Sequence, residues 1–135
     1  MSERRKRVMA GIVGLALVAM AGVSASAAGT WYSFNVTVPD WGGSTTTNNE
    51  RKTVDGAYSI KDVKVGTNHT VSVRLEDLNF NALSSYSVIA TGVERSFSSS
   101  GKAGQTVHMR LKTSTFQPAN IQVQGLWSPD NPDNL

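Results

Sequence analysis

The sequence predicts an all-β protein: a single antiparallel β-sandwich of about seven strands that follows a cleaved signal peptide. Three observations support this fold class. Apolar and polar residues alternate through most of the chain after residue 30, and short runs of this kind recur between Gly, Ser and Pro turn signals. No stretch of that part has the i, i+3, i+4, i+7 apolar spacing of an amphipathic helix, although one helical turn over 77–83 is an alternative. The spacing of the runs is typical of a β-sandwich.

The first 27 residues are predicted to be a secretory signal peptide. Residues 4–7 are basic, residues 8–23 are apolar, and Ala25-Ser26-Ala27 has the small-x-small pattern of a cleavage site. The alternative is an N-terminal membrane anchor, but the apolar run is shorter than the roughly 20 residues that a spanning helix needs. We therefore expect two regions, 1–27 as signal peptide and 28–135 as the β-sandwich domain with a polar C-terminal tail.

The charge of the protein is concentrated in this leader. Residues 4–7 supply four of the 13 basic residues and Glu3 one of the 10 acidic ones, so residues 28–135 carry nine of each. A neutral domain argues against a nucleic-acid partner. The chain also has no cysteine, which excludes disulfides, a thiol nucleophile, a zinc–thiolate site and a lipidated cysteine. We expect a secreted, extracellular bacterial protein without stable membrane insertion after cleavage.

The first strand alternates from Tyr32 to Val38, and the polar stretch 44–52 that follows lacks periodicity, so it is predicted to be a loop. In the next strand the apolar residues move from even positions, up to Ile60, to odd positions, from Val63 on. One extra residue in the strand would return both sets to the same face, so a β-bulge is predicted at Lys61-Asp62. Gly66-Thr67 then has the form of a two-residue hairpin turn that would pair this strand with 71–75. Further strands are expected within 86–91, 93–97, 106–112 and 119–127.

Strand parity also predicts the core. The residues expected to face it are Tyr32, Phe34, Val36, Ile60, Val71, Val73, Leu75, Val88, Val107, Met109, Leu111, Ile121 and Val123. Trp127 continues the alternating apolar positions of the last strand, and Trp31 directly precedes those of the first strand. Both are expected to be core residues or end plugs. Gly125 lies within the last strand, where a glycine indicates a bulge or a close backbone approach. Lys61, Lys64, Arg74, Arg110 and Lys112 are interpreted as charges that protect sheet edges.

The candidates for catalysis are weak. His69 and His108 fall on the polar side of their strands and are interpreted as solvated, Glu76 and Asp77 are adjacent and expected to point apart, and no Ser lies in a G-x-S-x-G turn. We therefore expect a protein that is not an enzyme and that has no cofactor.

Metal ligands are equally weakly indicated. Residues 77–81 match the opening D-x-N-x-N of a calcium loop, but Ala82 replaces the required Gly and Val88 the bidentate Glu. Asp130 and Asp133 are interpreted as part of a polar, proline-stiffened tail. No metal site is predicted.

The candidate ligand-binding residues are Trp41, Arg51 and Lys52. Trp41 lies in a Pro-Asp-Trp-Gly-Gly turn, and an exposed Trp on a loop can stack on a sugar ring or anchor a partner. Arg51-Lys52 is the only adjacent basic pair after the leader. We expect these residues to share one end of the sandwich with the loop 44–52; the alternative is that Trp41 folds back and caps the core.

The chain resembles a group of small secreted β-sandwich proteins of Gram-positive bacteria, mostly uncharacterised. The resemblance is carried by residues 31–36, 104–111 and 125–130, the last of which closes in Gly-Leu-Trp. It implies a β-sandwich and secretion. Gly29-Thr30-Trp31 is also similar to the mature start of some secreted bacteriocins.

Three function classes follow. The first is an extracellular binding protein that acts at the cell envelope, with an unknown protein or an envelope glycan as partner. The second is a secreted bacteriocin-like antibacterial effector, and the third is a hydrolase with an unrecognised site.

Overall fold

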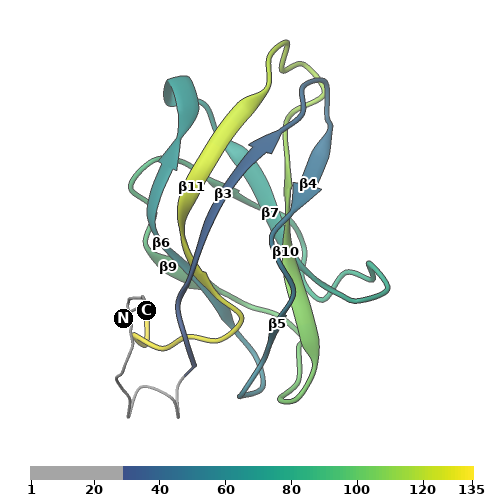
Figure 1. Ribbon diagram of the computed structural model, residues 1–135, viewed down its shortest axis with the longest axis vertical. Helices are drawn as coiled ribbons and strands as arrows, with labels where there is room; N and C mark the ends of the chain where they lie inside the picture. The colour runs from purple at the N-terminus through teal and green to yellow at the C-terminus, as the bar shows by residue number, and fades with distance from the viewer. Residues whose placement is uncertain (1–28) are drawn as a thin grey trace. The chain divides into compact units, whose positions relative to one another are not determined.

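The computed structural model describes residues 29–135 (Figure 1). The predicted signal peptide, residues 1–27, lies outside the described residues. Residues Trp31–Leu135 form one compact unit built from two antiparallel sheets. The predicted all-β sandwich is therefore confirmed.

One sheet has the strand order β3-β11-β6-β9, and the other has the order β4-β10-β7-β8, with β5 also paired to β10. The strand bounds are β3 (Tyr32–Val38), β4 (Ser44–Thr46), β5 (Glu50–Arg51), β6 (Tyr58–Val65), β7 (Val71–Asp77), β8 (Ser87–Ile89), β9 (Arg95–Phe97), β10 (Thr106–Lys112) and β11 (Ile121–Ser128). All the predicted strands are present. The predicted loop 44–52 is wrong, because β4 and β5 lie within it and pair with β10.

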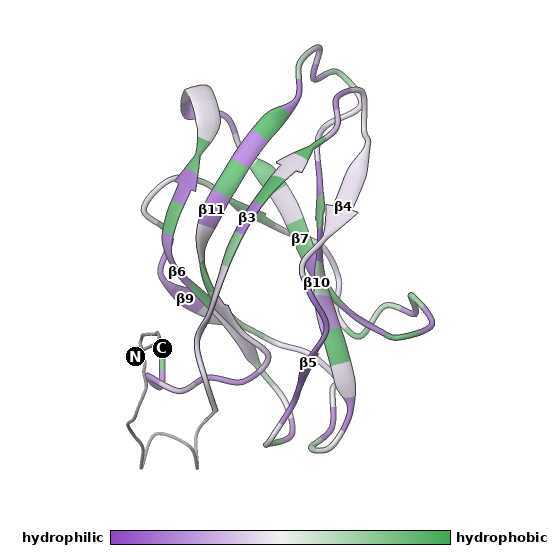
Figure 2. Cartoon of the chain, in the orientation of Figure 1, coloured by the Kyte–Doolittle hydropathy of each residue, from purple (hydrophilic) through white to green (hydrophobic). Residues whose placement is uncertain are grey.

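The core lies between the two sheets, and the apolar bands that alternate along their strands are visible in Figure 2. Most predicted core residues are buried, and Tyr32 and Val36 pack against the core while partly exposed. Trp127 is buried, as expected. Val88 was expected in the core but is exposed, because it lies opposite Ser72 on the outer side of the sheet and Ile89 takes the core position.

The predicted bulge in β6 is confirmed. The register between β11 and β6 shifts between Gln124 and Leu126, and Asp62 has a positive φ of 55°. A Cβ at Gly125 would lie 3.1 Å from the Lys61 carbonyl oxygen, so the β6 backbone passes too close for a side chain there.

The predicted hairpin between β6 and β7 is wrong. Gly66–Asn68 forms a short 3-10 turn, η2, and the two strands belong to different sheets. Both sides of β6 are taken by β11 and β9, so the turn carries the chain across the sandwich instead of folding β7 back onto β6.

Candidate functional site

The main polar cluster lies on the outer side of β7 and β10. Val73, Leu75, Met109 and Leu111 of these strands are buried in the core. The residues between them point the other way because strand side chains alternate. We call this surface the arginine face; it consists of Arg74, Glu76, His108, Arg110 and Lys112, with Phe80 and Tyr86 beside them.

Two arginines meet directly across the strand pair. Arg110 and Arg74 are Cα partners in the antiparallel register. Like charges directly opposite one another are destabilising, so such a pair needs compensation. Glu76 provides it: its Oε2 accepts hydrogen bonds from Arg74 Nε and from Arg110 Nε, both at 2.7 Å.

Glu76 is enclosed by its partners and has no exposed side-chain surface. Its Oε1 lies 2.9 Å from His108 Nε2, which is also buried. Desolvation raises the pKa of Glu76, but the hydrogen bonds from Arg110, His108 and Arg74 together outweigh it and lower the pKa below its usual value. Glu76 is therefore a carboxylate that holds both guanidinium groups in position.

His108 connects the arginine face to the segment between β4 and β5. Its Nδ1 lies 3.0 Å from Asn49 Oδ1, so both ring nitrogens have partners. The interpretation of His108 as a solvated histidine is wrong, because the ring is buried by Glu76 and Asn49 and is covered by Phe80 at 5.4 Å between ring centroids. His69 is exposed, as expected.

Two aromatic rings flank the cations. Arg110 lies over the ring of Phe80, and both Arg74 and Lys112 lie over the ring of Tyr86, at 4.7 Å for the Arg74 guanidinium carbon. Both rings remain exposed. The loop that carries Phe80 is closed by Asp77, whose Oδ1 accepts hydrogen bonds from the backbone N–H groups of Asn79 and Asn81. The D-x-N-x-N motif thus forms a turn that places an aromatic ring on the arginine face.

The arginines retain donors for a ligand. Arg110 uses Nε for Glu76 and Nη1 for Ser44, and Arg74 uses Nε and Nη2 for Glu76. Within residues 29–135, no protein atom accepts a hydrogen bond from Arg110 Nη2 or Arg74 Nη1. The side chains of Arg110 and Arg74 are 20% and 27% exposed, so the two guanidinium groups are held by Glu76 and are partly open to solvent.

The structure separates the predicted binding residues. Trp41 follows β3, close to the end of β10 that pairs with β4, whereas Arg51 pairs with Thr106 at the other end of β10. The expectation that Trp41 and the pair Arg51-Lys52 share one end is therefore wrong. Arg51 is exposed, but Lys52 is completely buried, because neighbouring residues of an extended chain face opposite sides.

Trp41 does not fold back onto the core. Its side chain is 61% exposed, and that of Phe116 on the neighbouring loop is 85% exposed. The two loops are joined by a hydrogen bond of 2.7 Å from the Trp41 N–H to the Gln117 carbonyl. We call Trp41 and Phe116 the aromatic tip; it is a second exposed surface, on the loop after β3 and the loop between β10 and β11. Both loops lie at the upper end of the sandwich in Figure 1.

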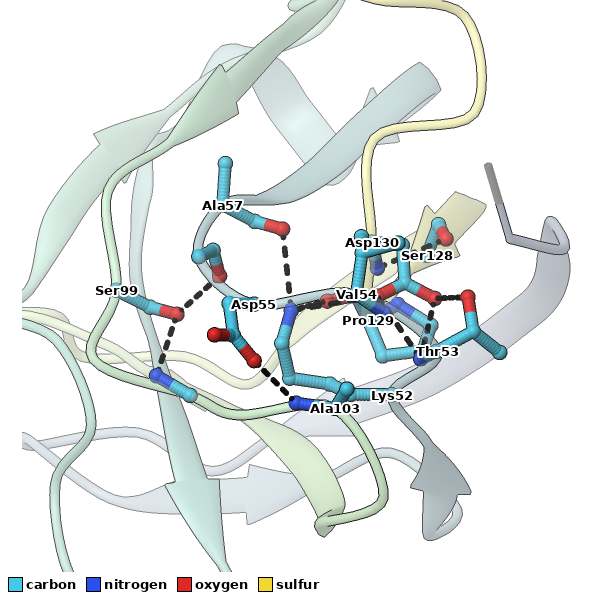
Figure 3. A network of polar contacts seen from close by, with 12 residues as sticks. Lys52, Thr53, Val54, Asp55, Ala57, Ser99, Ala103, Ser128, Pro129 and Asp130 are labelled. Carbon is cyan, nitrogen blue, oxygen red and sulfur yellow. Dashed lines mark hydrogen bonds and ion pairs between the residues drawn. The ribbon is translucent and has the colours of Figure 1, made fainter. Parts of the chain in front are cut away.

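The C-terminal segment is not a solvated tail. Asp130 is buried and forms an ion pair with Lys52, in the network that Figure 3 shows. The interpretation of residues 128–133 as a polar tail is therefore wrong for Asp130, whose charge is satisfied by buried partners. Asp133 forms a surface ion pair with Lys61 at 2.6 Å.

The interpretation of the strand charges as edge protection also needs correction. Arg74 and Arg110 lie on β7 and β10, which are paired on both sides. The alternation of apolar residues places both arginine side chains on the outer side of their strands, but it does not specify which residues pair across the two strands. Arg74 and Arg110 were not among the predicted site residues, and Glu76 was considered only as a weak catalytic candidate. The only sequence signal for the three was that charged residues of both signs occupy outward positions of two strands.

The described residues contain no group of His, Cys, Asp and Glu side chains arranged to hold a metal ion. The same part of the chain has no helix with the length and apolar character required to cross a bilayer. No protein-family model matches the chain, and no curated protein matches it significantly.

Proposed function

We propose that this chain is an extracellular, non-enzymatic binding protein that holds an anionic polymer of the bacterial cell envelope on the arginine face. The observation that carries the proposal is the direct cross-strand pairing of Arg74 and Arg110. This arrangement costs stability unless a negative group compensates it, and Glu76 supplies one negative charge against two positive ones.

The remaining positive charge is placed for recognition. Lys112 follows Arg110 on the outer side of β10 and adds a third cation, while Asp77 uses its carboxylate within its own turn. Guanidinium groups with free N–H donors bind carboxylates and phosphates strongly because charge and geometry both match. A ligand with repeated negative groups fits this row of cations.

The aromatic rings define a second property of the ligand. Phe80 and Tyr86 border the cations and are exposed, and aromatic rings stack on the apolar faces of sugars. A polymer that carries both sugar rings or an apolar backbone and anionic groups would use both kinds of contact. Envelope polymers with phosphate or carboxylate groups have this chemistry.

The surroundings of His108 favour binding over hydrolysis. Both of its ring nitrogens are engaged by Glu76 and Asn49, and within residues 29–135 no Ser hydroxyl forms a hydrogen bond with it. A general base needs a free nitrogen within reach of the proton that it removes. His108 instead supports the position of Glu76.

The experiment is co-sedimentation with peptidoglycan sacculi. Sacculi that retain their phosphate polymers are compared with sacculi from which acid has removed these polymers but not the peptide carboxylates. We expect wild-type protein to sediment with at least one preparation and to be released by salt, because exposed charges are screened. Binding to both preparations would identify carboxylates as sufficient, and binding to the first alone would identify phosphate.

Two matched variants locate the binding site. Arg110→Gln should weaken binding about 10-fold or more, since a hydrogen bond to a charged group contributes about 1.5–3 kcal/mol. Arg95→Gln removes the same charge from the other sheet, where Arg95 lies over Phe97, and should leave binding unchanged. Equal effects of the two variants, or no binding to either preparation, would overturn the proposal.

A further inference from the structure

A second buried network joins Lys52 to Asp130 (Figure 3). The Lys52 Nζ is 3.4 Å from Asp130 Oδ1, and the side chains are 0% and 1% exposed. Lys52 follows β5 of one sheet, and Asp130 follows β11 of the other. From this arrangement we propose that Lys52 and Asp130 form an intramolecular isopeptide bond, an amide between Nζ and Cγ.

The surroundings of Lys52 hold the side chain in one path. Its stem passes over Gly101, where a Cβ would lie 2.7 Å from Lys52 Cδ. The Nζ donates hydrogen bonds to the carbonyl oxygens of Ala57, at 3.2 Å, and of Pro129. The reacting nitrogen is thus confined beside the carboxyl group, which replaces a bimolecular encounter by a fixed contact.

Burial also changes the chemistry of the amine. Desolvation lowers the pKa of Lys52, although Asp130 and Asp55 oppose this effect. A neutral amine has two N–H groups, and the carbonyls of Ala57 and Pro129 can accept both. The third donor of the ammonium form points to Asp130 Oδ1 at 3.4 Å, so loss of that proton leaves the lone pair of a nucleophilic amine on the side of Asp130.

Asp130 is surrounded by donors. The Thr53 N–H donates to Oδ2 at 3.0 Å, the Val54 N–H donates to Oδ1 at 3.2 Å, and the Thr53 hydroxyl donates to Oδ2 at 2.8 Å. Addition of the amine to Cγ places negative charge on a carboxyl oxygen. Backbone N–H groups fixed around these oxygens stabilise that charge, as in an oxyanion hole.

The reaction is a condensation that needs no further reagent. A proton passes from the Lys52 ammonium to the Asp130 carboxylate, which gives an amine and a carboxylic acid. The amine attacks Cγ, the N–C bond forms, and the C–O bond to the protonated hydroxyl breaks. The hydroxyl leaves with the second amine proton as one water molecule.

The bond would tie the two sheets together in a chain without cysteine. It closes the loop from residue 52 to residue 130, which contains every strand from β6 to β11. A covalent link across so long a loop restricts the unfolded chain as a disulfide does. The chain has no cysteine and cannot form a disulfide, so the isopeptide bond would supply a covalent cross-link of another kind.

Mass spectrometry of the purified protein under denaturing conditions tests the proposal. We expect an intact mass lower than that of the unmodified chain by one water molecule, and a branched tryptic fragment that joins the peptides of Lys52 and Asp130, because trypsin does not cleave after an amidated lysine. An unchanged mass with cleavage after Lys52 would overturn the proposal.

Variants separate this bond from other losses of water. Lys52→Met and Asp130→Ala should each restore the unmodified mass, and the measurement does not require either variant to fold. Asp130→Asn should form the same amide with loss of ammonia. Loss of water that persists in Lys52→Met would indicate a cyclic imide at an aspartate and would contradict the isopeptide bond.

Discussion

Replacement of Glu76 by Gln removes the negative charge at the centre of the arginine face while the side chain keeps its size. Glu76 accepts three charge-assisted contacts, from Arg74, Arg110 and His108. Removing one partner of a buried ion pair costs about 3–5 kcal/mol when the remaining charge is buried. Arg74 and Arg110 are 27% and 20% exposed and regain part of their hydration. We therefore expect a loss of about 2–3 kcal/mol in the free energy of unfolding.

Urea denaturation at neutral pH measures this loss in free energy, and thermal unfolding should show it as a decrease in Tm of about 10–20 °C. Glu94→Gln is the control, because Glu94 is exposed and loses the same charge. The pH dependence provides a second check. The folded pKa of Glu76 lies below its unfolded value, so its stabilising effect is present above about pH 4.5 and disappears as the pH falls through the folded pKa. The difference between wild type and Glu76→Gln should shrink accordingly in acid. A change of less than about 0.5 kcal/mol at neutral pH would refute the reasoning.

Three further predictions concern other parts of the sandwich. Burial raises the pKa of Glu50 to about 7, so the folded chain binds this proton more tightly than the unfolded chain does. The free energy of unfolding should therefore fall as the pH rises from 4.5 to about 7. Glu50→Gln should remove this pH dependence, as measured by denaturation at a series of pH values. Gly125→Ala should destabilise by about 1–3 kcal/mol because its Cβ meets the β6 backbone, whereas Gly66→Ala, with contacts no closer than 3.4 Å, should have a small effect. Trp41→Ala should leave the unfolding midpoint nearly unchanged, because the side chain is exposed.

Each of these has a contradicting outcome. An unchanged pH slope in Glu50→Gln would show that another group titrates between pH 4.5 and 7. Equal effects of Gly125→Ala and Gly66→Ala would mean that the bulge can move away from β11. A clear loss of stability in Trp41→Ala would show that Trp41 packs against the core after all.

The strands and their core could be predicted because alternation is a local property. Val73 and Leu75 in β7, and Met109 and Leu111 in β10, follow from a period of two alone. β4 and β5 could not be predicted in this way, because they are two or three polar residues long and exist only through pairing with β10. The same limit explains the false hairpin at Gly66-Thr67, since a turn motif does not specify which sheet the next strand joins.

The candidate site was less accessible to sequence analysis. Outward parity places Arg74 and Arg110 on polar sides of two strands, but only the register makes them direct neighbours with Glu76 between. Arg51 and Lys52 are adjacent in the sequence and were therefore expected to act together. In an extended chain, however, neighbouring side chains point to opposite sides, so Arg51 is exposed and Lys52 is buried. Asp130 lies in a polar sequence, and its burial depends on the distant Lys52.

The central claim is that the arginine face binds an anionic envelope polymer, and mapping of amide chemical shifts tests it most directly. The labelled protein is titrated with soluble, phosphate-bearing wall polymer, and with a carboxylate polymer in a parallel series. The account predicts shifts that saturate and cluster on β7 and β10 around Arg74, Arg110 and Lys112, and that are lost in Arg110→Gln but not in Arg95→Gln. Shifts confined to the loops of Trp41 and Phe116, or no shifts with either polymer, would contradict it.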